Sequence, residues 1–195
     1  PKALECIPML KRSDIKKEAA KIVNEELTVD NSLFLYHDVC TNGIGYVDLM
    51  FKTDSIAPEQ IPYLGLLKSV LGYVDTENYT YGELFNEINA NTGGINCGVE
   101  VFDRADSTEE FQAMFSVRGK ALYTKMDFLF KMIGEILNSS KLEDTKRLYE
   151  IVASVKSRAQ VNLTGAGHST AVLRAAAYSS PMAAFQDEMA GIGYY

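Results

Sequence analysis

The sequence predicts an α+β domain, in which an antiparallel β-sheet carries helices packed on one face. Two pairs of neighbouring segments, within residues 33–51 and 95–122, alternate apolar and polar residues with the period of two typical of half-buried strands. The segments between and after these pairs repeat apolar residues every three to four positions, as amphipathic helices do. Strands that pair with sequence neighbours, and helices that are separate from them, indicate an α+β rather than an α/β fold.

The first predicted hairpin has the arms Leu33–Val39 and Gly45–Phe51, joined by a turn at Asn42-Gly43. Asn-Gly readily adopts positive φ at both central positions of a tight turn, which favours a hairpin. In the second arm one face carries Val47, Leu49 and Phe51. This arrangement is typical of a strand with one buried face.

Two segments precede this hairpin. Residues 2–10 are expected to be extended, because Pro8 interrupts regular structure. Ser13 can cap a short helix that runs to about Glu26, with Ile15, Ala19 and Ile22 on one face.

Two helices are predicted after the hairpin. The first begins near Pro62, which suits a first helical turn, and its core stripe consists of Leu64, Leu67, Leu71 and Val74. The second covers about residues 80–91 and carries Leu84, Phe85 and Ile88. It should end at Gly93-Gly94, since glycine readily adopts the left-handed conformation of a helix C-terminus.

A second antiparallel pair is predicted for Ile95–Phe102 and Phe111–Leu122, joined by an acidic surface connection. Helices follow at residues 125–137, from Asp144 to about Leu163, at 168–178, and from Ser180-Pro181 to Met189. The helix after Asp144 is expected to direct five side chains inward: Leu148, Ile151, Val152, Val155 and Ala159.

Composition excludes several classes of function. The net charge of −7 and the lack of any Lys/Arg-rich run argue against a nucleic-acid partner. No apolar run approaches the roughly 20 residues that span a bilayer, so no membrane partner is expected. Cys6, Cys40 and Cys97 are scattered and odd in number, which favours a reducing compartment, and we expect a cytoplasmic location. The chain begins at Pro1 and stops just after a helix, so we expect a piece of a longer polypeptide, although a trimmed small protein would look the same.

No catalytic, cofactor-binding or metal-binding residue is predicted. His37 and His168 have no further ligand at metal-binding spacing. Cys40 and His37 are three residues apart in a predicted strand, so their side chains should point to opposite faces, and both Cys40 and Cys97 are interpreted as buried thiols. Residues 165–170 could present N–H groups to an anion, but a plain break between helices is the favoured interpretation.

Several strings resemble the presequence-protease branch of the insulinase-like (pitrilysin) zinc metallopeptidases. The longest is His37–Phe51, which resembles the hairpin that begins the C-terminal half of those enzymes. Shorter strings fall in matching order at Pro62–Leu64, Thr92–Ile95, Gly167–Ser169 and Leu173–Ala176. The resemblance extends from about Cys6 to the end of the chain.

The resemblance implies an enzyme of two similar halves, joined by a helical hairpin, that enclose a chamber where peptides are cut. Each half holds two α+β domains, and zinc and the base lie on an inverted His-x-x-Glu-His helix in the first domain. This chain resembles the first domain of the C-terminal half. Residues 1–29 would then be a lead-in segment and short helix after the linker between the halves, and 30–195 a single non-catalytic domain, incomplete at its C-terminal end.

The helix after the first hairpin would be equivalent to the zinc helix. Leu64 and Lys68 then stand in place of the histidines and Leu67 in place of the glutamate. Two apolar side chains and an ammonium group can neither bind Zn²⁺ nor deprotonate a bound water. The resemblance therefore implies that zinc belongs to the catalytic domain of the parent protein, with no cofactor in this chain.

The resulting functional hypothesis is a non-catalytic domain of a zinc-dependent peptidase, which forms part of the chamber wall and the interface with the catalytic half. Its partners would be the catalytic N-terminal half of the same polypeptide and the parent's peptide substrates. Cut from its neighbours, the fragment should expose an apolar patch and self-associate. Two alternatives remain open: a stand-alone, catalytically inactive peptide- or protein-binding module, and a small enzyme that uses Cys40 or Cys97. The length of the open reading frame separates the module from the fragment.

Overall fold

The computed structural model describes residues 9–15, 18, 21, 23–107 and 109–195, and the chain forms two compact units, 1–41 and 42–195. Among the described residues of the first unit, a 3-10 turn, η2, spans Arg12–Asp14. The predicted helix to Glu26 is wrong at its end, because Glu25 and Glu26 begin a strand. Ala19 and Ile22, on its predicted inner face, lie outside the described residues, as does most of the predicted lead-in. The predicted division after residue 29 stays a prediction.

The first unit contains an antiparallel hairpin of β1 (Glu25–Val29) and β2 (Ser32–Tyr36). Its turn residues, Asp30 and Asn31, have φ angles of 47° and 66°, the left-handed values that tight hairpin turns require. The predicted hairpin between Leu33–Val39 and Gly45–Phe51 is therefore wrong. Asn42 and Gly43 do adopt positive φ, but the segments on either side of them pair with other strands.

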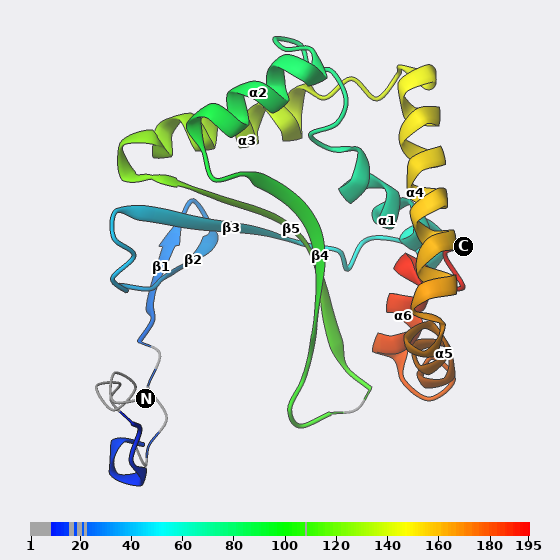
Figure 1. The fold of residues 1–195 in the computed structure, drawn as a ribbon, viewed down its shortest axis with the longest axis horizontal. Helices are drawn as coiled ribbons and strands as arrows, with labels where there is room; N and C mark the ends of the chain where they lie inside the picture. Colours follow the sequence, from blue (N-terminus) through cyan, green and yellow to red (C-terminus); the bar gives the residue numbers. More distant parts are fainter. Residues whose placement is uncertain (1–8, 16–17, 19–20, 22, 108) are drawn as a thin grey trace, which may run out of the picture. The chain divides into compact units, whose positions relative to one another are not determined.

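The second unit is built on a three-stranded antiparallel sheet in the order β3 (Ile44–Lys52), β5 (Phe111–Leu122), β4 (Ile95–Asp103), as Figure 1 shows. The predicted pairing of the segments that form β4 and β5 is confirmed. The register places Leu49, Val117 and Cys97 in one row across the three strands. All three contribute to the core, so one face of the sheet is the buried one.

Six α-helices are described, and the predicted α+β class is confirmed. Three of them contribute to the core against the sheet: α1 (Ile61–Val70), α2 (Tyr81–Asn91) and α3 (Met126–Ser139). The other three group beside α1 (Figure 1): α4 (Thr145–Gly165), α5 (Gly167–Ala176) and α6 (Pro181–Ala190). Short 3-10 turns precede α1 and α3, at η3 (Pro58–Gln60) and η4 (Tyr123–Lys125). None of the described helices is both long and apolar enough to traverse a bilayer.

Local sequence signals determine where several helices begin. Thr80 and Glu83 form a reciprocal capping box at α2, with Thr80 N donating to Glu83 at 2.9 Å and Glu83 N donating to the Thr80 hydroxyl at 3.3 Å. The predicted cap Asp144 accepts a hydrogen bond from Arg147 N at 3.0 Å. Ser180, before Pro181, accepts one from Ala183 N at 3.3 Å. These caps satisfy N–H groups that the first helical turn leaves without partners.

The main core lies between the sheet and helices α1–α3. Its fully buried side chains include Leu84, Val117, Leu129 and Met132. The predicted burial of Leu64, Leu71 and Val74 is confirmed, and Leu67 packs against the core. The predicted helix is too long, because α1 ends at Val70 and Leu71 and Val74 lie in the turn that follows it, where Gly72 has a φ of 84°.

Two predicted core positions are wrong. Phe51, on the predicted buried face of its strand, is 46% exposed, and Val152 on α4 is 40% exposed. Helix α4 packs along a narrow stripe in which Ile151 is buried and Leu148 and Val155 are half-buried. Val152 lies outside this stripe because it is one residue beyond Ile151, about 100° around the helix.

Candidate functional site

The helix α1 combines core residues with one half-buried cation. Leu64 is buried and Leu67 packs against the core. Lys68 is half-buried instead, and its side chain lines a pocket between α1 and α4. Lys68 is therefore the one of these three residues that is available to a ligand.

The two histidines lie in separate compact units, and both are exposed. His37 follows the end of β2, and His168 is in the first turn of α5. Among residues 9–15, 18, 21, 23–107 and 109–195, no three His, Cys, Asp or Glu side chains lie close enough to hold a metal ion. The segment 165–170 contains the break between α4 and α5, as predicted, with Ser169 N donating to Ala166 O at 3.0 Å.

The two described cysteines differ in environment. Cys40 is exposed, so its predicted burial is wrong, because residues 37–40 lie beyond β2 rather than within a strand. Cys97 is half-buried in β4 and packs against the core. This burial raises the pKa of the Cys97 thiol to about 11. Cys97 is therefore poorly suited to be a nucleophile.

Alkylation of Cys97 is expected to be slow in the folded chain. With a pKa of about 11, roughly one thiol in a thousand is ionised at pH 8, against about a quarter for an unperturbed cysteine. In a Cys6→Ser, Cys40→Ser variant, iodoacetamide should react about two hundred times more slowly than in the same variant unfolded in guanidinium, as followed by mass spectrometry. A rate within tenfold of the unfolded one would contradict this and reopen the cysteine-enzyme hypothesis.

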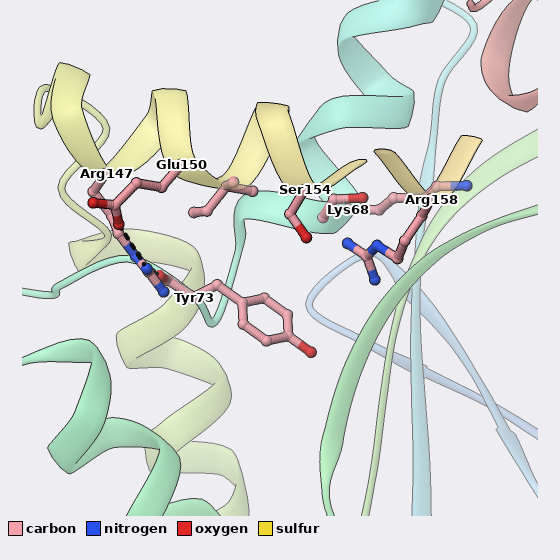
Figure 2. Close-up of a pocket in the computed structure, with 8 residues that line it drawn as sticks. Lys68, Tyr73, Arg147, Glu150, Ser154 and Arg158 are labelled. Carbon is pink, nitrogen blue, oxygen red and sulfur yellow. Dashed lines mark hydrogen bonds and ion pairs between the residues drawn. The ribbon is translucent and has the colours of Figure 1, made fainter. Parts of the chain in front are cut away.

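A groove lies between α1 and α4. Its first part has a volume of about 410 Å³ and is drawn in Figure 2. An adjoining part of about 340 Å³ extends toward α6 and the C-terminal residues. We call the two parts together the α1–α4 groove. Both parts are lined by Lys68, Ser69 and Arg158.

Arg147, at one end of the groove, is fully engaged by the protein. Its guanidinium pairs with Glu150 at 3.2 Å, donates to Tyr73 O at 2.9 Å and stacks 3.9 Å from the centre of the Tyr81 ring. The dashed line in Figure 2 marks the pairing between Arg147 and Glu150. This cation therefore holds α4 against the end of α1 and the start of α2.

Lys68 and Arg158 are in a different situation. Neither side chain makes an ion pair or hydrogen bond with any described residue. Burial lowers the pKa of Lys68, because a half-desolvated ammonium group loses hydration without gaining a counter-ion. The groove thus presents two cations that the protein itself leaves uncompensated.

Comparison with known proteins identifies the family. The sequence model of the family described as peptidase M16-C associated matches residues 1–195. The chain belongs to this family. The predicted resemblance to the presequence-protease branch of the insulinase-like peptidases is thereby confirmed.

Relatives of this peptidase-associated chain are much longer proteins. This chain is 38% identical over 192 residues to Protein HypA of Clostridium perfringens, and the match covers 98% of this chain. It is 29% identical to the mitochondrial presequence protease of Yarrowia lipolytica and 28% identical to the chloroplastic/mitochondrial presequence protease 1 of Arabidopsis thaliana, over 98% and 100% of this chain. The matches cover 20%, 19% and 18% of those proteins, so the chain spans about a fifth of their length. Some of these relatives are named as mitochondrial or chloroplastic proteins, so the expected cytoplasmic location of this chain stays a prediction.

Sequence reasoning about this peptidase-associated chain predicted neither Lys68 nor Arg158 as a binding residue, and it named Lys68 only as the residue in place of a zinc histidine. Lys68 stands out as a cation in the apolar pattern of α1, whereas α4 carries many polar residues and Arg158 is one among several. The spacing of polar residues along α4 could have identified Arg158. Arg147, Ser154 and Arg158 follow one another at four- to seven-residue intervals on the face of α4 that carries the buried Ile151.

Proposed function

We propose that this chain is a non-catalytic domain of a zinc-dependent peptidase that degrades peptides. In this proposal it forms part of the wall of the peptide chamber and of the interface with the catalytic half. The single observation that supports it most is the composition of α1 in a chain of this family. Leu64 and Leu67 are committed to the core, and Lys68 carries a positive charge, so the helix offers no zinc ligand and no general base.

The zinc ion that the family resemblance implies does not fit this chain. The side chains at the equivalent positions of α1 cannot coordinate a cation, and the described residues bring no other suitable set together. We therefore assign no catalytic step to any residue here. The zinc and the general base would belong to another domain of the parent protein.

The sheet face opposite the core supports a role at an interface. It carries apolar side chains that the second unit leaves exposed, among them Tyr46, Met50 and Phe102. Between them Arg118 pairs with Asp48 at 2.7 Å and with Glu100 at 3.1 Å, so one guanidinium joins all three strands. A mixed apolar and charged face on a firmly connected sheet suits contact with another protein surface or with a peptide.

The test compares this chain with the whole protein that contains it, using an unstructured fluorogenic peptide with and without a chelator. The whole protein should cleave the peptide, and the chelator should abolish cleavage. This chain, supplied with zinc, should give no cleavage above the buffer rate.

Chelator-sensitive cleavage by this chain alone would overturn the proposal. Absence of peptidase activity in the whole protein, or an open reading frame of about 195 residues, would instead favour the peptide-binding module. The interface is tested separately with a photo-crosslinker at Tyr46 on the sheet face and, as a control, at Tyr149, which is 77% exposed on α4. Position 46 should crosslink to the other half or to a peptide, and equal yields at both positions would contradict the assigned face.

A further inference from the structure

We propose that the α1–α4 groove binds a carboxylate of a peptide, held between Lys68 and Arg158, with an apolar side chain of the same peptide on the neighbouring wall. The peptide nature of the ligand rests on the proposed function, whereas the anion site rests on the groove alone. Figure 2 shows Lys68 coming from α1 and Arg158 from α4, so the site exists only when the two helices are packed together.

The charges of the groove favour an anion. Lys68 and Arg158 line both of its parts, and the remaining charged groups in the first part, Arg147 and Glu150, pair with each other. Two uncompensated cations therefore stand in the groove of a chain whose net charge is −7. Lys68 is half-buried and Arg158 is exposed at the edge of the groove. An anion between them would offset the repulsion of the two like charges, and guanidinium and ammonium groups are the usual partners of carboxylates.

Hydroxyl groups add neutral donors to the same space. Ser154 comes from the same face of α4 as Arg158. Ser69 lies next to Lys68 on α1, and its hydroxyl donates to Gly65 O at 3.5 Å. The hydroxyl of Tyr194, in the adjoining part, is buried and has no hydrogen-bond partner in the described chain. A buried hydroxyl without a partner is costly, so a polar atom of a bound peptide, or a water, would satisfy it.

The adjoining part of the groove determines the kind of anion. Its lining includes the apolar residues Val155, Leu163 and Met189. A free inorganic anion would not cover the parts of these side chains that face the groove. A peptide that carries a carboxylate next to an apolar side chain satisfies both parts, because the charge lies between the cations and the side chain covers the apolar wall.

The experiment measures binding of a labelled, short probe peptide that contains Leu-Glu, using the 195-residue chain and fluorescence anisotropy. A matched probe with Leu-Gln tests the charge, and competition by acetate and by inorganic phosphate tests the anion alone. Lys68→Met and Arg158→Met should each weaken binding of the Leu-Glu probe about tenfold or more, the cost of losing one charge-assisted contact. Lys156→Met, which removes an exposed cation of α4 outside the groove, should change the affinity less than about twofold.

Thermal unfolding of each variant shows whether it folds. Lys68→Met should unfold at the same or a higher temperature, because burial disfavours the charged ammonium group, so lost binding with unchanged stability supports the site. Equal binding of the Leu-Gln probe, or equal loss with Lys156→Met, would overturn the proposal. So would phosphate binding as tight as the peptide, which would indicate a simple anion site. The assay needs no peptidase activity, so its failure is distinguishable from failure of the proposed function.

Discussion

Replacing Asp187 with alanine is expected to lower the free energy of unfolding of the 42–195 unit by about 3 kcal/mol, the range found when one partner of a buried ion pair is removed. Asp187, on α6, is 1% exposed. Its carboxylate accepts hydrogen bonds from Arg174 at 2.7 Å, from Ile192 N at 3.1 Å and from Gly193 N at 3.2 Å. One buried side chain therefore joins α5, α6 and the segment after α6.

The loss is large because each donor would remain without its acceptor. The two backbone N–H groups cannot move away without releasing residues 191–195, which also return to Asp187 through hydrogen bonds from Gly191 N and Tyr194 N to its carbonyl. Arg174 is 43% exposed on its side chain and can return to water, which keeps the cost at the lower end of the range for buried pairs. The expected decrease in the midpoint of thermal unfolding is about 6–12 °C for a chain of this size.

Urea denaturation followed by circular dichroism measures this change. Asp187→Asn, which keeps an acceptor oxygen but not the charge, should lose less than Asp187→Ala. Glu188→Ala is the matched control, since Glu188 is exposed and adjacent in sequence, and it should change the free energy by less than about 0.5 kcal/mol. Equal effects at positions 187 and 188 would show that the carboxylate network does not stabilise this region.

The elements that sequence alone predicted well are those whose signals are local. The caps at Asp144 and Ser180 lie within three residues of the N–H groups that they satisfy, and the buried Leu64 and half-buried Leu67 lie one turn apart on α1. Strand pairing is different. The partner of β3 is β5, and Asp48 lies 70 residues from the Arg118 that it faces. No local pattern specifies such a contact, because its register depends on the whole sheet.

Two competing turns explain the wrong hairpin. Asn42-Gly43 is the stronger turn signal, yet Asp30 and Asn31 also adopt left-handed φ and join β1 to β2. The sequence predicts a helix that runs to about Glu26, so the segment that forms β1 is not expected to be a strand that could pair with β2. The same kind of limit applies to residues 158 and 187. Residue 158 lines the groove together with Lys68 of α1, and the carboxylate of residue 187 is paired with Arg174 of α5, so neither role could be read from the local sequence. By contrast, Lys68 is identifiable because a cation in an apolar stripe is a local anomaly.

Replacing Gly65 with alanine is expected to lower the free energy of unfolding by about 2 kcal/mol, although the same change normally stabilises a helix interior by about 1 kcal/mol. Gly65 is buried in α1, where α6 crosses it. A methyl group at this position would collide with the carbonyl oxygen of Met189 and lie 3.2 Å from the Tyr194 ring. The carbonyl belongs to the backbone of α6, so the clash is relieved only if the two helices separate.

Gly134→Ala in α3 is the matched control, because a methyl group there meets no atom within 4 Å and should stabilise the chain by about 0.5–1 kcal/mol. The two substitutions are chemically identical, so opposite signs in urea denaturation isolate the α1–α6 contact from helix propensity. Gly65 also lines the groove, and separation of α1 from α6 should weaken binding of the Leu-Glu probe as well. A stabilised Gly65→Ala variant would mean that α1 and α6 do not approach this closely. The lining of the groove next to Met189 and Tyr194 would then differ from that described above.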